Sequence, residues 1–301
     1  MLKIQKYAAI DIGSNAVRLL ISNIIEEADK PVKFKKNSLV RVPIRLGADV
    51  FINGEISVYN QQRMVDTMMA FSLLMKSHGV NRYKACATSA MREASNSELL
   101  TSRVLNSSGI NIDIIDGEEE AAIIAETDLH SFIDPNRTYL YVDVGGGSTE
   151  FSIIHNGGKV NSKSFKIGTV RLLNDMVKKQ TWDDVEQWIK ENTHQYYKIE
   201  LIGSGGNINK IFKISGKDLG KPLTYFYLSN YYNTLQSYSY EERITQLDLN
   251  QDRADVIIPA TRIYLSAMKW SGAKDIFVPK IGLSDGIIKS IYYETVSSVT
   301  I

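Results

Sequence analysis

The chain has 301 residues, of which 44% are hydrophobic and 23% charged, an ordinary balance for a folded globular protein. This length exceeds what a single hydrophobic core usually serves, so we expect two domains. The net charge of +1 gives no overall field that would draw the protein onto nucleic acid or an anionic membrane, and we expect neither as a partner. Any anion-binding site must therefore be built locally.

The cysteine and histidine residues argue against two further kinds of site. The one cysteine, Cys86, rules out an intramolecular disulfide, and its apolar neighbours favour a buried side chain over a reactive thiol. The histidines stand singly and never at ligand spacing, so we do not expect zinc. Asp11 interrupts the apolar run that begins at Tyr7 too early for a secretory signal, and no run is long enough to span a membrane. We therefore expect a cytoplasmic protein.

In chain order, the first half predicts strands and helices. The run from Tyr7 to Ile12 is continuous and apolar, as in a strand buried on both faces of its sheet. Met64, Met68 and Met75 recur at helical spacing and indicate core packing rather than a cofactor site. The predicted strands are 7–12, 16–25, 40–46, 84–88 and 110–115, and the predicted helices are 61–78, 97–107 and 118–132.

The second half opens in the same way. Its predicted strands are 138–144, 150–155, 159–165, 199–202 and 276–279, and its predicted helices follow Asn207, cover 225–240 and begin at 285. A strand, an Asp-Gly loop and a second strand thus recur after about 130 residues, and a repeat of this length indicates two related domains rather than a solenoid.

The segment from Asp143 to Glu150 carries the strongest functional signal. Its three consecutive glycines are more than a turn requires, and they let successive backbone N–H groups converge into an anion nest. The carboxylate of Asp143 beside such a nest makes electrostatic sense with a cation between them, and Mg²⁺ suits that role. Glu150 can supply a second oxygen to the metal or orient a bound water. The segment therefore predicts a phosphate site with a divalent cation.

The segment from Asp11 to Asn15 repeats this pattern in the first half. Alone it is a weaker signal, because its one glycine, Gly13, can serve a simple turn. Because it repeats the pattern of the loop at Asp143, its interpretation as a phosphate-binding loop is strengthened. Two such loops facing each other across a cleft would hold a phosphate chain from both sides.

Three further segments leave functional and structural interpretations open. Arg92 follows a buried strand and can fork onto a phosphate oxygen, or it can pair with Glu93 or Glu98 on an exposed helix. The three acids 118–120 open a helix, where they either offset its dipole or place one carboxylate to take a proton from water. The glycine-rich loop 203–207 enters a helix whose free N–H groups can bind another anion or approach a nucleobase, although a lone glycine loop is a weak signal.

These segments together resemble the exopolyphosphatase / guanosine pentaphosphate phosphohydrolase (Ppx/GppA) family of the actin, Hsp70 and sugar-kinase superfamily. The resemblance covers nearly the whole chain and runs through residues 11–19, 45–47, 87–96, 117–121, 143–150, 168–172 and 203–206. It implies an α/β fold of two related actin-like (ribonuclease H-like) domains, each with a mixed sheet, and an interdomain cleft. We expect the first domain at 1–125 and the second at 126–284, with the final helix, 285–301, packing back on the first.

Carried over residue by residue, the resemblance implies a role for each site position. Glu120 would be the general base, with Glu119 as the alternative, and Arg92 would clamp phosphate. Asp143, Glu150 and Asp11 would hold Mg²⁺ or another divalent cation. The implied phosphate-binding residues are Ser14, Asn15, Gly145, Gly146, Gly147, Ser148, Gly205 and Gly206.

The activity implied by the resemblance is metal-assisted hydrolysis of a terminal phosphoanhydride bond. The substrate would be inorganic polyphosphate or the 5′ end of guanosine pentaphosphate. The alternatives are an ATP-dependent kinase of the same fold and a sensor that binds guanosine tetraphosphate without cleaving it. A homodimer is compatible with the family. In one departure, Ser284 and Asp285 replace an Arg-Glu pair common in the family, so the arginine of that pair is lost in this chain.

Overall fold

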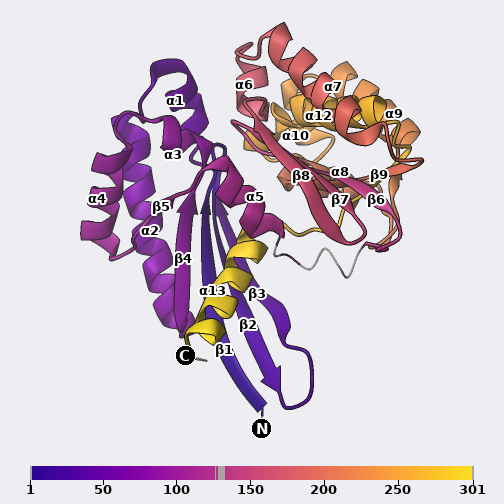
Figure 1. The fold of residues 1–301 in the computed structure, drawn as a ribbon. Coiled ribbons are helices and arrows are strands. Elements are labelled where there is room, and N and C mark those ends of the chain that lie inside the picture. Colours follow the sequence, from indigo (N-terminus) through magenta and orange to yellow (C-terminus); the bar gives the residue numbers. More distant parts are fainter. Residues whose placement is uncertain (1, 126, 128–132, 300–301) are drawn as a thin grey trace. The chain divides into compact units, whose positions relative to one another are not determined.

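The computed structural model describes residues 2–125, 127 and 133–299. The chain divides into two compact units (Figure 1): unit 1 comprises Met1–Thr127 and Leu283–Ile301, and unit 2 comprises Asp128–Gly282. The end of the helix predicted at 118–132 lies outside the described residues. No helix formed by the residues that the structure describes is long and apolar enough to cross a membrane.

Each unit contains one β-sheet with helices around it. The elements of unit 1 are β1 (Leu2–Ile12), β2 (Val17–Glu27), β3 (Lys33–Val42), α1 (Leu46–Asn53), α2 (Val58–His78), β4 (Arg82–Ala87), α3 (Ser89–Glu93), α4 (Ser97–Ser108), β5 (Asp113–Ile114), α5 (Gly117–Ala125) and α13 (Leu283–Val299). The elements of unit 2 are β6 (Thr138–Val144), β7 (Thr149–His155), β8 (Gly158–Phe165), α6 (Thr169–Leu173), α7 (Lys179–Thr193), β9 (Ile199–Ser204), α8 (Gly206–Ile214), β10 (Leu223–Thr224), α9 (Tyr225–Ser237), α10 (Tyr240–Thr245), α11 (Gln251–Ala254), α12 (Ile257–Ser271) and β11 (Asp275–Phe277).

The two sheets share one topology. In unit 1 the strand order is β3-β2-β1-β4-β5, with β1–β2 and β2–β3 antiparallel and β1–β4 and β4–β5 parallel. In unit 2 the order β8-β7-β6-β9-β11 repeats these relations strand for strand, and β10 is added at the far edge. The predicted α/β class, with a mixed sheet in each half, is therefore confirmed.

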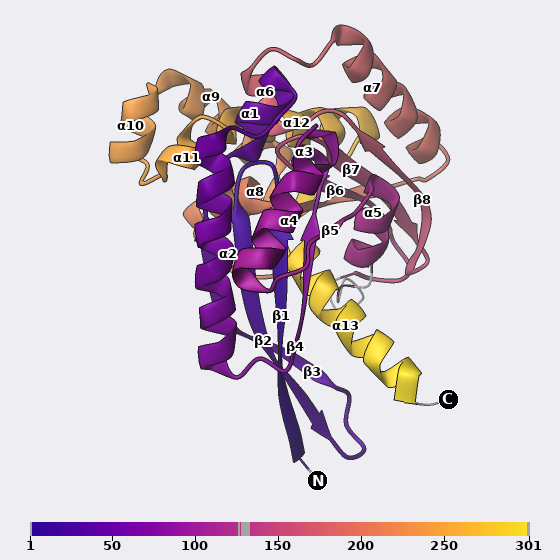
Figure 2. The same ribbon diagram turned by 90° about the vertical axis from the view of Figure 1, so that its left-hand side faces the viewer.

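The central strand of unit 1 is buried on both faces. Helix α13 packs on β1, β2, β4 and α5. Figure 2 shows α2 on the opposite side of this sheet. All residues from Tyr7 to Ile12 are buried as a result, which explains the continuous apolar run in the sequence. Gly286 in α13 is required for this packing, because a Cβ there would lie 2.1 Å from the carbonyl oxygen of Ile123 in α5.

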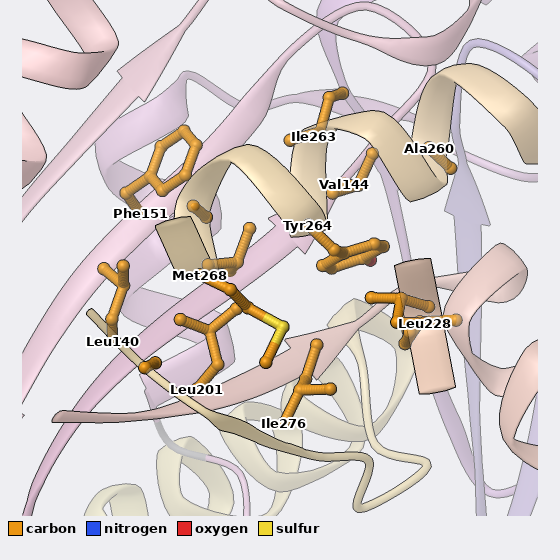
Figure 3. Close-up of a cluster of buried hydrophobic side chains, with 14 of the residues drawn as sticks. Leu140, Val144, Phe151, Leu201, Leu228, Ala260, Ile263, Tyr264, Met268 and Ile276 are labelled. Atoms are coloured by element: carbon orange, nitrogen blue, oxygen red, sulfur yellow. The ribbon is translucent and has the colours of Figure 1, made fainter. Parts of the chain in front are cut away.

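The core of unit 2 lies between its sheet and α12. Figure 3 shows Ile263, Tyr264 and Met268 of α12 among side chains of the strands, including Leu201 and Ile276. These side chains are at most 1% exposed. The same helix packs against α6, α7, α8 and α9, so it links the sheet to most of the helices of the unit. Tyr264 of this helix reaches the last residue of β9, Ser204.

Several predicted elements need correction. The strand predicted at 40–46 is β3, which lies earlier, and Leu46 instead begins α1. Arg45 ends the extended segment with a left-handed backbone (φ 61°), and the apolar alternation continues across this break because Leu46 is buried in a helix. The strand predicted at 110–115 is reduced to the two residues of β5. The helix predicted at 225–240 ends at Ser237 as α9, and a capping box at Ser239 then begins α10.

Candidate functional site

In unit 1, the loop after β1 is held by two distant segments. The amide of Gly13 donates to the carbonyl of Ala16 at 3.1 Å and closes a tight turn. The hydroxyl groups of Ser14 and Ser89 lie 2.9 Å apart in a buried hydrogen bond. The amide of Gly47 donates to the carbonyl of Ser14 at 2.8 Å. The loop is thus fixed from the start of α1 and from the start of α3, although both are remote in sequence.

The aspartate at the end of β1 forms an ion pair within its own sheet. Asp11 is directly opposite Arg18 across the β1–β2 ladder, and Arg18 Nη1 donates to Asp11 Oδ2 at 2.6 Å. Ser284 Oγ, at the start of α13, lies 3.5 Å from the same oxygen. Asp11 is 5% exposed and the side chain of Arg18 is 32% exposed, so the ion pair is partly shielded from solvent. The metal role implied for Asp11 stays a prediction, and the ion pair does not favour it.

In unit 2, the equivalent loop follows β6. The amide of Gly145 donates to the carbonyl of Ser148 at 3.0 Å, as Gly13 does to Ala16. Asp143 and Glu150 are directly opposite each other across the β6–β7 ladder. Residues paired in this way point to the same face of a sheet, so the two carboxylates are neighbours.

The repeat therefore places different charges at one equivalent position. Arg18 stands seven residues after Asp11, and Glu150 stands seven residues after Asp143. In unit 1 the aspartate faces a built-in cation, whereas in unit 2 it faces a second carboxylate. Two facing carboxylates repel, and a divalent cation between them reverses the sign of the interaction.

The residues of unit 2 fit such a cation. Mg²⁺ is commonly bound by one or two carboxylates together with waters and substrate phosphates. The described residues contain no group of three or more His, Cys, Asp or Glu side chains that could hold a metal, so a complete protein cage is absent from that part of the chain. Glu150 Oε1 accepts from Ser148 Oγ at 2.7 Å and from Ser164 Oγ at 2.9 Å, which fixes the orientation of its carboxylate.

A second glycine loop of unit 2 lies beside Asp143. Gly205, between β9 and α8, has φ +117°, and a Cβ there would lie 3.0 Å from the carbonyl oxygen of Val144 and 3.5 Å from Asp143 Oδ1. The buried hydroxyl of Tyr264 donates to the carbonyl of Ser204. Burial, and then the charge of Asp143, raise the pKa of Tyr264 well above its usual value, so this hydroxyl stays protonated. The predicted phosphate-binding residue Gly205 is thus adjacent to the predicted metal ligand Asp143, and Gly206 follows it as the first residue of α8.

The acids of α5 occupy unequal environments. Asp116 Oδ1 accepts from the amides of Glu118 and Glu119 at 2.9 and 2.8 Å and caps the helix. Glu118 and Glu119 are exposed, whereas Glu120 is 8% exposed. Because Asp116 already caps the helix, the side chain of Glu120 is not needed as a cap. Its burial favours Glu120 over Glu119 as the predicted base, a role that stays a prediction.

Arg92 contacts the segment that leads into these acids. Its Nη1 donates to the carbonyl of Ile115 at 2.6 Å. The predicted phosphate clamp is thus hydrogen-bonded to backbone just before the cap at Asp116. This contact joins α3 to the start of α5 and helps to hold Glu120 in place.

A family model decides the identity of the chain. The model of the Ppx/GppA phosphatase family matches residues 30–294, which span both units. The chain belongs to the Ppx/GppA phosphatase family. The resemblance inferred from the motifs is therefore confirmed.

Curated proteins and solved structures place this Ppx/GppA chain among known proteins. A guanosine-5′-triphosphate,3′-diphosphate pyrophosphatase of Aliivibrio fischeri is 25% identical over 98% of the chain and 62% of its own length. Exopolyphosphatase 1 of Mycobacterium bovis is 29% identical over 49% of the chain and 42% of its own length. The crystal structure of an exopolyphosphatase from Cytophaga hutchinsonii has a TM-score of 0.81 at 22% identity and covers 98% of both chains. Other curated relatives are matched over only 32% of their length.

Four residues of this Ppx/GppA chain contact the predicted site segments but were not selected from the sequence. They are Arg18, Ser89, Arg171 and Tyr264. Arg18 had a usable signal, because its position repeats that of Glu150. Ser89 and Arg171 lie in two of the segments that carry the family resemblance, 87–96 and 168–172, but no local spacing pairs them with their loops. Tyr264 lies outside those segments.

The thiol of Cys86 is expected to be unreactive in the folded protein. Cys86 is 0% exposed, and burial raises its pKa from 9.0 to about 12. The native protein should react with a thiol reagent far more slowly than the urea-unfolded chain at the same pH. Because the folded pKa lies above the unfolded one, this group stabilises the fold below pH 9, and that contribution is lost between pH 9 and about 12. Urea titrations of the parent and of Cys86→Ala at several pH values between 9 and 12 give the free energy of unfolding of each protein. If this free energy falls equally with pH in both proteins, the contribution of Cys86 is contradicted.

Proposed function

We propose that the protein is a metal-assisted phosphohydrolase that releases the terminal phosphate of inorganic polyphosphate, of the 5′ end of guanosine pentaphosphate, or of both. The facing carboxylates of Asp143 and Glu150, beside a triple-glycine loop, carry the metal-dependent part of this proposal. The family membership and the names of the curated relatives support the substrate class.

The site residues of unit 1 and those of unit 2 have separate tasks. Bound Mg²⁺ supplies charge neutralisation at the terminal phosphate. In unit 2, the glycine loop donates backbone N–H groups to phosphate oxygens, and Asp143 and Glu150 hold the cation. In unit 1, Glu120 accepts a proton from the attacking water, while Ser14 and Asn15 bind phosphate. Most of the catalytic effect then comes from positioning and electrostatic stabilisation of charge.

A phosphate-release assay on both substrates, with Mg²⁺ and with a chelator, tests the proposal. We expect orthophosphate from at least one substrate, with release lost when the metal is removed. Parallel incubation with γ-labelled ATP distinguishes other activities, because transfer of label to an acceptor other than water would indicate a kinase. Tight binding of guanosine tetraphosphate without phosphate release from either substrate at any Mg²⁺ concentration would instead indicate a sensor and would overturn the proposal.

A further inference from the structure

The triple-glycine loop of unit 2 is held from one side by the short helix α6. Three successive carbonyl groups of the loop accept hydrogen bonds from three successive residues of the helix. The pairs are Thr169 N to Gly145 O at 3.0 Å, Val170 N to Gly146 O at 2.8 Å, and Arg171 Nε to Gly147 O at 2.8 Å. The first two donors are backbone amides, whereas the third is a side chain. The orientation of the Gly147 peptide therefore depends on Arg171.

This arrangement sets the direction of the loop amides. In a trans peptide the N–H of the next residue points away from the carbonyl, so the amides of Gly146, Gly147 and Ser148 point away from α6. Among the backbone hydrogen bonds of the described loops, none has one of these three amides as its donor. They are consequently available to an anion on the side opposite the helix.

Helix α6 and the glycine loop approach each other so closely that no side chain fits at Gly168, between them. A Cβ at Gly168 would lie 2.4 Å from the carbonyl oxygen of Gly146, so only glycine permits this approach. Arg171 is 8% exposed, and its guanidinium reaches the loop from within the fold. A buried guanidinium has a rigid planar geometry, which suits it to hold one carbonyl in one orientation.

We propose that Arg171 is a positioning residue that presets the glycine loop for the phosphate oxygens of a phosphoanhydride. It acts through the carbonyl of Gly147, whose fixed orientation aims the amide of Ser148 at the anion. This inference rests on the proposed function for the identity of the ligand. The hydrogen bond from Arg171 to the carbonyl of Gly147 is present in the ligand-free protein. Loss of the side chain frees the Gly147 peptide to rotate, and the anion must then order the loop at a cost in affinity.

Binding of methylenediphosphonate, a diphosphate analogue that cannot be hydrolysed, tests this role by calorimetry in the presence of Mg²⁺. We expect Arg171→Ala to weaken binding at least about tenfold, the range for a hydrogen bond to a charged group. Millimolar guanidinium should restore part of the lost affinity by occupying the vacated site. The matched control is Arg262→Ala, which removes the same charge from an exposed position of unit 2 over the ring of Trp182. This control should bind as the parent does.

Amide hydrogen exchange separates positioning from general destabilisation and from failure of the proposed function. The amides of Thr169 and Val170, which donate to the loop, should exchange faster in Arg171→Ala, while the slowest amides of the core exchange at the parent rate. Parent-like affinity in Arg171→Ala would overturn the inference, as would weak binding that guanidinium does not restore. If the parent protein fails to bind the analogue, the proposed function fails. If, in addition, Thr169 and Val170 exchange at the parent rate in Arg171→Ala, the positioning role of Arg171 is overturned as well.

Discussion

Replacement of Glu120 by glutamine is expected to slow phosphate release at least about a hundredfold and to leave phosphate binding intact. Glutamine keeps the size and most of the hydrogen-bonding capacity of the side chain but cannot accept a proton from water. Glu120 is buried near the start of α5, where Asp116 supplies the cap, so the substitution leaves the end of the helix satisfied. Stopped-time phosphate release gives the rate, and calorimetry with methylenediphosphonate gives the affinity.

Glu119→Gln is the matched control for this result. Its side chain is exposed one position earlier on the same helix, and its backbone makes the same kind of contact to Asp116 as that of Glu118. We expect this variant to retain most of the parent rate. A hundredfold loss in Glu119→Gln with a parent-like rate in Glu120→Gln would exchange the two assignments. Parent-like rates in both variants would remove α5 from the mechanism.

The relation between the two halves was predictable because short stretches of consecutive residues carry the same pattern in each half. Asp11 and Asp143 each lie one residue before the end of a buried apolar strand and precede a glycine turn, and an antiparallel strand follows each turn. Both strand pairs form with the same register relative to the aspartate. The duplicated sheet follows from these local patterns, because a strand buried on both faces needs neighbours on both edges and helices on both faces.

The parts that could not be predicted depend on contacts between remote segments. Ser89 meets Ser14, and Arg171 meets Gly147, only after the sheets and helices have packed. The start of α1 was missed because Arg45 adopts a left-handed backbone without being glycine, so the residue type gives no signal for the break. Tertiary contacts from Asn15 and Ser14 to this segment support that conformation.

The contrast between Arg18 and Glu150 leads to the second large effect. If a divalent cation relieves the repulsion between Asp143 and Glu150, then Asp143→Asn should raise the Mg²⁺ concentration for half-maximal activity at least about tenfold and lower the maximal rate. Direct titration of Mn²⁺, followed by electron paramagnetic resonance in the absence of substrate, should show the same loss of affinity. This second measurement reports metal binding independently of turnover.

Asp11→Asn is the internal control, because its sheet position is equivalent and its carboxylate is paired with Arg18. This variant loses a partly buried ion pair and should be less stable and less active, since the charge of Asp11 that faces the guanidinium of Arg18 is removed. Its half-maximal Mg²⁺ concentration and its Mn²⁺ affinity should nevertheless match those of the parent. A shift in metal affinity as large as that of Asp143→Asn would restore Asp11 to the metal site, and it would show that the guanidinium of Arg18 does not take the place of a cation in unit 1.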